Sequence, residues 1–151
     1  MNEEKYMKEA IKQAKKAYEQ DEVPIGCVIV KDDKIIARAY NKREKLQQSY
    51  AHAEMLAIQK ACKKLNTWRL EDCDLYVTLE PCPMCAGAII QSRIRNVYFG
   101  AYDKKGGSVM TCTNLFDVKE YNHHPHYFSG IMEEECSILL KNFFKEKRKK
   151  R

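Results

Sequence analysis

The order of apolar and polar positions predicts helices and strands that alternate along the chain. Apolar residues recur at three- and four-residue steps over residues 3–20, which is the pattern of an amphipathic helix. Residues 25–30 form a continuous apolar run, as expected for a buried strand, and Pro24 separates this run from the helix. A polar turn follows, and residues 35–40 are predicted to return as the second strand of a hairpin.

The rest of the chain continues this alternation and adds two loops. The first loop is polar and covers residues 41–50, and the second covers residues 101–125 and is rich in Gly, Asn, His and Lys. A loop as long as the second is usually functional in a compact domain. The other elements expected are a helix from about 52 to 64, a strand at 75–79, a helix at 83–92, a strand at 96–100, a short strand at 127–128 and a helix from about 131.

Strands interleaved with helices predict an α/β fold, a three-layer α/β/α sandwich around a five-stranded sheet. The sheet is expected to be mixed because its first two strands form a hairpin. A length of 151 residues suits one domain, so we expect a single domain over residues 1–151, with a basic tail from about 145 to 151.

Composition favours a globular protein over a disordered or membrane-spanning one. Hydrophobic residues make up 44% of the chain, which is enough to form a core. Apolar runs stay well short of the roughly 18 residues that a membrane span needs, and no signal-peptide region follows the first residues. We therefore expect a cytoplasmic protein without a membrane partner, whose seven cysteines are reduced and in part bound to metal.

The charge of the chain is compatible with a nucleic-acid partner. The net charge is +6, which favours polyanions, although a solvated basic surface would give the same total. The distribution is more informative, because a run of basic residues directly follows Phe143 and Phe144 at the end of the chain. Proteins that bind single-stranded RNA stack bases on aromatic rings and pair phosphates with cations.

Two short motifs carry the candidate chemistry: His52 to Glu54, and Pro81 to Cys85. Cysteines at positions i and i+3 face the same way on a first helical turn, so Cys82 and Cys85 can reach one metal ion together with His52. One imidazole and two thiolates suit zinc and leave one coordination position open for water, whose pKa zinc lowers to about 7. Glu54 is then placed to transfer protons.

These motifs also admit other interpretations. The Cys82–Cys85 pair alone could be a redox pair. A structural zinc site would need a fourth protein ligand, which a histidine of residues 123–126 or another cysteine could supply. The remaining cysteines lack partner spacing and are interpreted as packing residues or incidental thiols: Cys27, Cys62, Cys73, Cys112 and Cys136.

The chain resembles the zinc-dependent deaminases, whose signature joins H-x-E to P-C-x-x-C. It is similar in particular to the bacterial tRNA-specific adenosine deaminases, in chain order and over nearly its whole length. The matching segments are VPIG at 23–26, Asn41, AHAE at 51–54, WRL at 68–70, LYVTLEPCPMCAGA at 75–88, SRI at 92–94, NH at 122–123 and FF at 143–144. Residues 106–112 and His124 depart from the family pattern.

The resemblance implies a cytidine deaminase-like fold and the hydrolysis of adenosine to inosine at the wobble position of a tRNA anticodon. It implies a homodimer with one zinc ion per subunit, held by His52, Cys82 and Cys85, and Glu54 as the proton shuttle. Asn41 is implied to contact the base, although it could simply close a turn. The other implied substrate-binding residues are Val23, Pro24, Ala53, Asp103, Lys105, Asn122, His123, Phe144 and Arg148.

Three other functions share some of these features. A deaminase of a free base or nucleoside, such as guanine or cytosine, would use the same zinc motif without the basic, aromatic C-terminus. A non-catalytic, zinc-stabilised RNA-binding module would have a fourth protein ligand in place of water. A thioredoxin-like redox protein would form a reversible Cys82–Cys85 disulfide.

Overall fold

A mixed five-stranded sheet forms the middle layer of the molecule, which the computed structural model describes over residues 2–149. The strand order is β2-β1-β3-β4-β5, with antiparallel pairs around β1 and parallel pairs around β4. The mixed sheet predicted from the hairpin is therefore confirmed. The strands are β1 (Gly26–Lys31), β2 (Lys34–Tyr40), β3 (Cys73–Leu79), β4 (Asn96–Ala101) and β5 (His126–Phe128).

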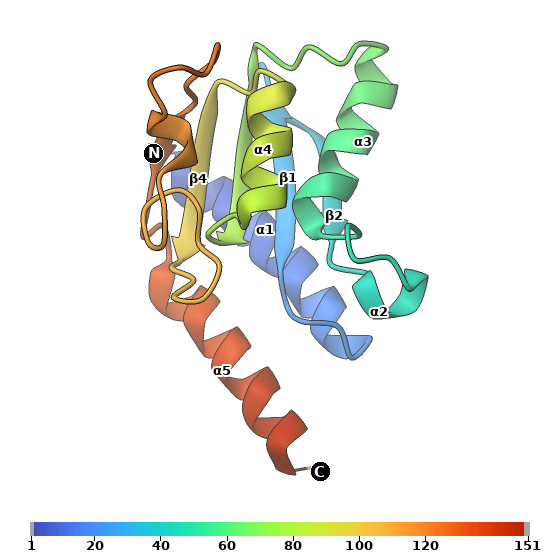
Figure 1. The fold of residues 1–151 in the computed structure, drawn as a ribbon. Coiled ribbons are helices and arrows are strands. Elements are labelled where there is room, and N and C mark those ends of the chain that lie inside the picture. Colours follow the sequence, from blue (N-terminus) through green and yellow to red (C-terminus); the bar gives the residue numbers. More distant parts are fainter. Residues whose placement is uncertain (1, 150–151) are drawn as a thin grey trace.

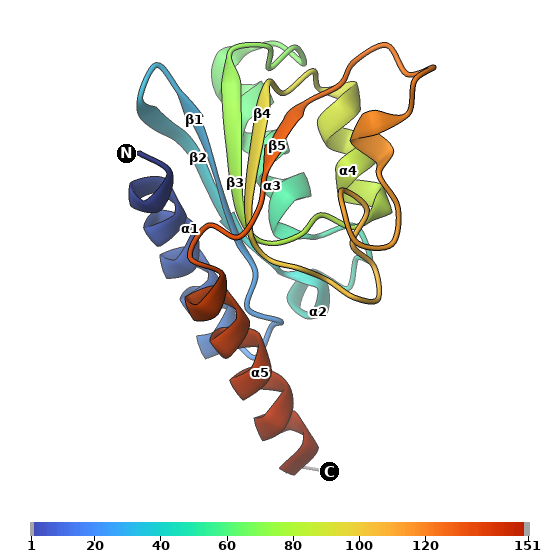
Figure 2. The same cartoon turned by 90° about the vertical axis from the view of Figure 1, so that its left-hand side faces the viewer.

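Helices cover both faces of the sheet, which confirms the three-layer sandwich (Figure 2). On one face lie α1 (Asn2–Glu19) and α5 (Glu133–Lys149), and on the other lie α3 (Ala53–Leu65) and α4 (Pro83–Gln91). None of the helices in the described part of the chain is both long and apolar enough to cross a membrane.

The continuous apolar run of β1 is explained by burial on both sides of the sheet. Successive side chains of a strand point to opposite faces. Cys27 and Ile29 accordingly pack with α3 and α4, whereas Val28 and Val30 pack with α1 and α5. Each fully buried aliphatic side chain of this kind contributes about 1.5–3 kcal/mol. The two cores together fix where the helices begin relative to the strand ends.

α5 is fixed on the sheet by a close contact between Cys136 and Gly100 of β4. A Cβ atom built at residue 100 would lie 2.4 Å from the Cys136 sulfur, so only glycine lets the helix approach this closely. From this contact α5 extends past the end of the sheet (Figure 1). The expected basic tail is helical over residues 145–149, and residues 150 and 151 lie outside the described part of the chain.

Two predicted loops contain short helical segments that the apolar pattern does not reveal. The first loop includes α2 (Arg43–Leu46), and the second includes the 3-10 turn η1 (Leu115–Asp117). No residue of α2 is buried, so the segment lacks the apolar stripe by which a helix is recognised in a sequence. α2 and the first turns of α3 and α4 lie at the same end of the sandwich (Figure 1).

Candidate metal and substrate site

Three potential metal ligands meet where α3 and α4 begin. His52 is the N-cap residue of α3 and Cys82 that of α4, while Cys85 lies on the first turn of α4. Pro83 occupies the first turn of α4, where a missing amide hydrogen costs nothing and the fixed φ angle favours the helix. The local sequence thus turns both sulfurs toward the same point.

The ligand atoms are close enough to share one ion. His52 Nδ1 lies 3.6 Å from the Cys82 sulfur and 3.5 Å from the Cys85 sulfur. All three ligand atoms lie within 4.8 Å of one another, and this is the only such group of three or more His, Cys, Asp or Glu side chains among residues 2–149. One nitrogen and two sulfurs fit a borderline-soft metal ion.

The protonation of the two thiols is unequal. The pKa of Cys82 is lowered to about 4, mainly by a hydrogen bond from the Cys85 thiol and also by one with His52, which together outweigh the effect of burial. The same Cys85–Cys82 hydrogen bond, together with burial, raises the pKa of Cys85. The hydrogen bond with Cys82 also raises the pKa of His52. The lowered pKa of Cys82 favours its thiolate, which is the form of cysteine that binds a metal ion.

Glu54 is a buried carboxyl beside this group. Its side chain is 4% exposed, although it lies on the first turn of α3. Burial is the main cause that raises the pKa of Glu54 to about 7, and the negative charge of Cys82 acts in the same direction. A carboxyl with a pKa near neutrality can both accept and donate a proton, which is what a proton shuttle requires.

Asn41 lies buried directly after β2, and its side chain makes two hydrogen bonds. Its side-chain nitrogen donates to the Val23 carbonyl at 3.3 Å, and its side-chain oxygen accepts from the Arg43 amide at 3.2 Å. The turn role considered for Asn41 is therefore present in the structure. Val23 and the buried Pro24 belong to the segment between α1 and β1, which passes next to this turn.

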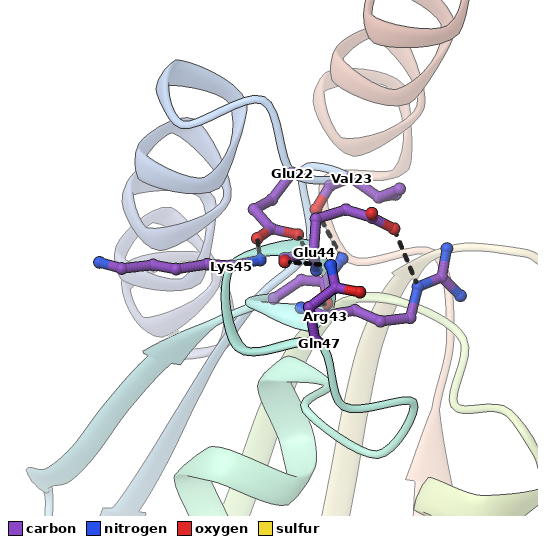
Figure 3. Close-up of polar contacts among 7 residues, drawn as sticks. Glu22, Val23, Arg43, Glu44, Lys45 and Gln47 are labelled. Atoms are coloured by element: carbon purple, nitrogen blue, oxygen red, sulfur yellow. Dashed lines mark hydrogen bonds and ion pairs between the residues drawn. The ribbon is translucent and has the colours of Figure 1, made fainter.

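Glu22 is a residue of this region that the sequence did not reveal. Its carboxylate is 1% exposed and accepts hydrogen bonds from the amides of Glu44, at 3.0 Å, and Lys45, at 2.7 Å. Figure 3 shows its side chain, which comes from the α1–β1 segment, hydrogen-bonded to the start of α2. A carboxylate satisfies the free amides of a first helical turn, so Glu22 explains why α2 forms without an apolar face.

Glu80 is a second buried carboxylate that the sequence did not reveal. Its oxygens accept hydrogen bonds from backbone amides of the loop after β4 and from the Thr111 hydroxyl. Burial alone would raise the pKa of Glu80, but the hydrogen bonds from Thr111, Met110 and Asp103 outweigh it and lower the pKa. A charged residue between the buried strand β3 and Pro81 was the only signal in the sequence.

The other predicted substrate-binding residues occupy three places. Asp103 and Lys105 lie on the loop after β4, where the Asp103 carboxylate accepts a hydrogen bond from the Lys105 amide at 3.1 Å. Asn122 is exposed, and His123 binds the Ile94 carbonyl through Nε2 at 2.7 Å. Ala53 is buried as the first residue of α3.

The two aromatic residues near the C-terminus have different environments. Phe143 is 5% exposed and contacts Tyr18 of α1, with the ring centres 5.6 Å apart, whereas Phe144 is 45% exposed. One of the two neighbouring rings is therefore buried and the other is exposed. Arg148 is exposed on the same helix.

Among residues 2–149, the structure offers no fourth protein ligand for a structural zinc site. Within residues 2–149, the metal-binding group contains only His52, Cys82 and Cys85, and His124 instead binds the Val118 carbonyl at 2.8 Å. All seven cysteines are free thiols. Those predicted to be packing residues are buried at 27, 73 and 136, while Cys62 is half-buried and Cys112 exposed.

The chain is similar to known deaminases over nearly its whole length. Residues 1–148 match the family model of the MafB19-like deaminases. A tRNA-specific adenosine deaminase of Bacillus subtilis (strain 168) is 60% identical over 148 residues, which cover 98% of this chain and 92% of the relative.

Two solved structures of deaminases also match this chain, at different levels of similarity. A structure from studies of A-to-I editing by tRNA:A34 deaminases at the wobble position of transfer RNA matches with a TM-score of 0.87 and 46% identity, covering 90% of this chain and 99% of the other. A guanine deaminase from Bacillus subtilis matches with a TM-score of 0.66 and 33% identity, covering 99% of this chain and 95% of the other.

Proposed function

The chain belongs to the MafB19-like deaminases and, among them, to the tRNA-specific adenosine deaminases, and from this premise we propose that it hydrolyses adenosine to inosine at the wobble position of a tRNA anticodon. The observation that carries the proposal is the group of His52, Cys82 and Cys85 beside the buried Glu54. The enzyme is a hydrolase that acts on the C–N bond of an amidine. Its similarity to adenosine deaminases of tRNA exceeds its similarity to the guanine deaminase.

We propose that the metal is zinc, with one ion per subunit. An imidazole and two thiolates are the donor set of many catalytic zinc sites, in which three protein ligands leave one position open. When bound there, zinc would supply a water molecule whose pKa is lowered to about 7. Cys85 would have to give up its proton to hold the ion, because only a thiolate is a good ligand.

Glu54 moves the protons of the reaction. It takes a proton from the attacking water and delivers it to N1 of the adenine ring while the new C6–O bond forms. It then takes the proton of the new hydroxyl group and passes it to the exocyclic nitrogen. The C6–N bond breaks, ammonia leaves, and inosine remains. The balance is adenosine plus water giving inosine plus ammonia.

Asn41 and the Ala53 backbone are proposed to bind the base. The adenine must first turn out of the stack, which costs a few kcal/mol and least in a single-stranded loop. The amide of Ala53 lies on the first turn of α3 and has no partner within the helix, so it is free to donate. Val23 and Pro24 would form the adjacent wall of the pocket.

The remaining contacts are proposed to hold the anticodon stem-loop. Phe144 would stack on an unpaired base, and Arg148, one helical turn further on, would pair with a phosphate. The others in this group are Asp103, Lys105, Asn122 and His123. We also propose a homodimer, as the family resemblance implies, and a cytoplasmic location, as expected from the sequence.

Inosine should appear at the first anticodon base when the zinc-loaded protein is incubated with an anticodon stem-loop that carries adenosine there. Nucleoside analysis and ammonia release would both detect the reaction. Guanine, cytosine and their nucleosides serve as parallel substrates and should remain unchanged. Conversion of guanine alone would support a free-base deaminase, and stem-loop binding without ammonia would support a non-catalytic RNA-binding module.

Phe144→Ala should weaken stem-loop binding about 5- to 160-fold, since stacking on an aromatic ring contributes about 1–3 kcal/mol per base. It should lower the melting temperature only slightly, because the exposed Phe144 ring contacts just the edge of Phe143. The matched variant is Phe143→Ala, which removes the buried ring one residue earlier. It should lower the free energy of unfolding by about 3–5 kcal/mol. Fluorescence anisotropy and thermal unfolding measure the two effects. Unaltered RNA affinity in Phe144→Ala would remove this residue from the proposed contact surface.

A further inference from the structure

We propose that Glu80 is a positioning residue that fixes the loop over residues 103–111 next to the metal ligands and thereby presents Asp103 and Lys105 to the substrate. The substrate part of this inference rests on the proposed function. The anchoring part concerns only the protein and can be tested without RNA. The Glu80 carboxylate and the loop groups that donate to it form the Glu80 clamp.

The first observation is the number of donors that converge on one carboxylate. One oxygen of Glu80 accepts from the amides of Val109, Met110 and Thr111, at 3.2, 2.8 and 3.0 Å. The other accepts from the Asp103 amide at 3.1 Å and from the Thr111 hydroxyl. The Glu80 side chain is buried, so these hydrogen bonds face little competition from water.

The second observation is that both ends of the loop donate to the same side chain. Residues 103–111 form no helix or strand. Both ends of the segment donate to Glu80, so a single side chain closes the loop. Ordering a loop costs conformational entropy, and a buried carboxylate with several donors is a strong compensating interaction.

The third observation links this loop to the metal site. Glu80 precedes Cys82 by two residues, and the Ser108 amide donates to the Pro81 carbonyl at 2.9 Å. Glu80 itself donates its amide to the Ala101 carbonyl at 2.9 Å. The segment that leads into the metal ligands is therefore the same segment that holds the loop, so their relative positions are fixed by adjacent residues.

Gly107 shows how tightly the loop fits against the carboxylate. A Cβ atom built at residue 107 would lie 2.3 Å from a Glu80 carboxylate oxygen and 2.6 Å from the Asp103 carbonyl oxygen. Only glycine avoids both contacts. The loop thus has a local shape that the Glu80 clamp requires.

Asp103 connects the Glu80 clamp to Lys105, the other proposed RNA contact on this loop. The Asp103 amide donates to Glu80, and the Asp103 carboxylate accepts from the amides of Lys105, at 3.1 Å, and Gly106, at 3.2 Å. Loss of the clamp would therefore release Asp103 and the exposed Lys105 together. This loss should weaken substrate binding more than it slows the chemical step, because Glu54 and the metal ligands are not part of the clamp.

Glu80→Gln is the decisive variant because it keeps the size of the side chain but replaces one of its two acceptor oxygens with a donor NH2 group. A carboxylate offers acceptors only, whereas an amide turns two N–H groups toward loop donors. With the zinc-loaded protein and the stem-loop substrate, KM should rise at least about tenfold while kcat changes less than about threefold. The loss of a hydrogen bond to a charged group has an effect of at least about this size on an equilibrium constant. Metal content should stay at the wild-type level.

Thr111 supplies a graded and matched pair of variants. Thr111→Val removes the hydroxyl donor at constant shape and should raise KM to a value between those of the wild type and Glu80→Gln. Thr111→Ser keeps the hydroxyl and should restore the wild-type KM. A general loss of folding would not distinguish serine from valine in this way.

Amide hydrogen exchange of the wild type and Glu80→Gln tests the anchoring part in the absence of RNA. The amides of Val109, Met110 and Thr111 should exchange at least about tenfold faster in the variant, while the strand amides of β3 should be unaffected. Unchanged protection of the three loop amides would overturn the proposal. So would faster exchange with an unchanged KM, or loss of zinc from Glu80→Gln. A wild-type protein that does not deaminate the stem-loop contradicts the proposed function instead, and the exchange result still decides the anchoring.

Discussion

Glu54→Ala is expected to lower turnover of the stem-loop by about 10²- to 10⁴-fold, the range that a positioned proton-transfer group contributes. The variant should retain its metal, because Glu54 is not part of the group formed by His52, Cys82 and Cys85. Single-turnover inosine formation and metal analysis of the same preparation give the two readouts. A variant with near-normal turnover would refute the proton-transfer role.

Glu54→Gln is the matched control for this experiment. Glutamine fills the same buried volume, so it should leave the packing of α3 intact, but it cannot accept a proton near neutral pH. We expect it to be as inactive as the alanine variant. If glutamine restored turnover, Glu54 would act by shape or hydrogen bonding rather than by proton transfer.

Cys82→Ser and Cys85→Ser are expected to abolish measurable activity through loss of the metal. A serine hydroxyl is a poor substitute for a thiolate, and the affinity for zinc should fall at least about 100-fold, since even weaker perturbations around a ligand cost 10- to 100-fold. Because the bound metal stabilises only the folded state, removing it from the wild type with a chelator should also lower the melting temperature.

Cys112→Ser is the control for the cysteine variants. Cys112 is exposed and lies outside the metal-binding group, so its replacement should leave zinc content and turnover unchanged. Metal content after dialysis and inosine formation are measured side by side for all the variants. A Cys82→Ser protein that keeps one equivalent of zinc would contradict the assigned ligand set.

The sheet, the four long helices and the metal-binding group could be predicted from the sequence, because each leaves a recognisable pattern of residue types. Alternation and helical periodicity mark the strands and helices, and the spacing of His52, Cys82 and Cys85 marks their chemistry. The buried ring at Phe143 could not be distinguished from Phe144 by sequence, since the choice depends on where α5 packs against Tyr18.

The sequence could not reveal α2 or the roles of Glu22 and Glu80. The two carboxylates bind mainly backbone amides that lie 22 to 31 residues away in the chain. Every residue except proline has such an amide, so the residue types in the sequence do not identify the partners. Each carboxylate resembles an ordinary surface charge until the fold brings the loop to it. The two loops next to the candidate site are thus each held by one acidic residue that only the structure identifies.

The packing of α5 does not allow insertions or deletions between two of its buried contacts. Cys136 is fixed against Gly100, and Phe143 and Phe144 follow on the same uninterrupted helix. Inserting or deleting one residue between Cys136 and Phe143 would rotate everything beyond it by about 100° around the helix axis. The Phe143 ring would then no longer point into the core, and the Phe144 ring would no longer occupy its exposed position. Single-residue changes in length should therefore not be tolerated in this stretch.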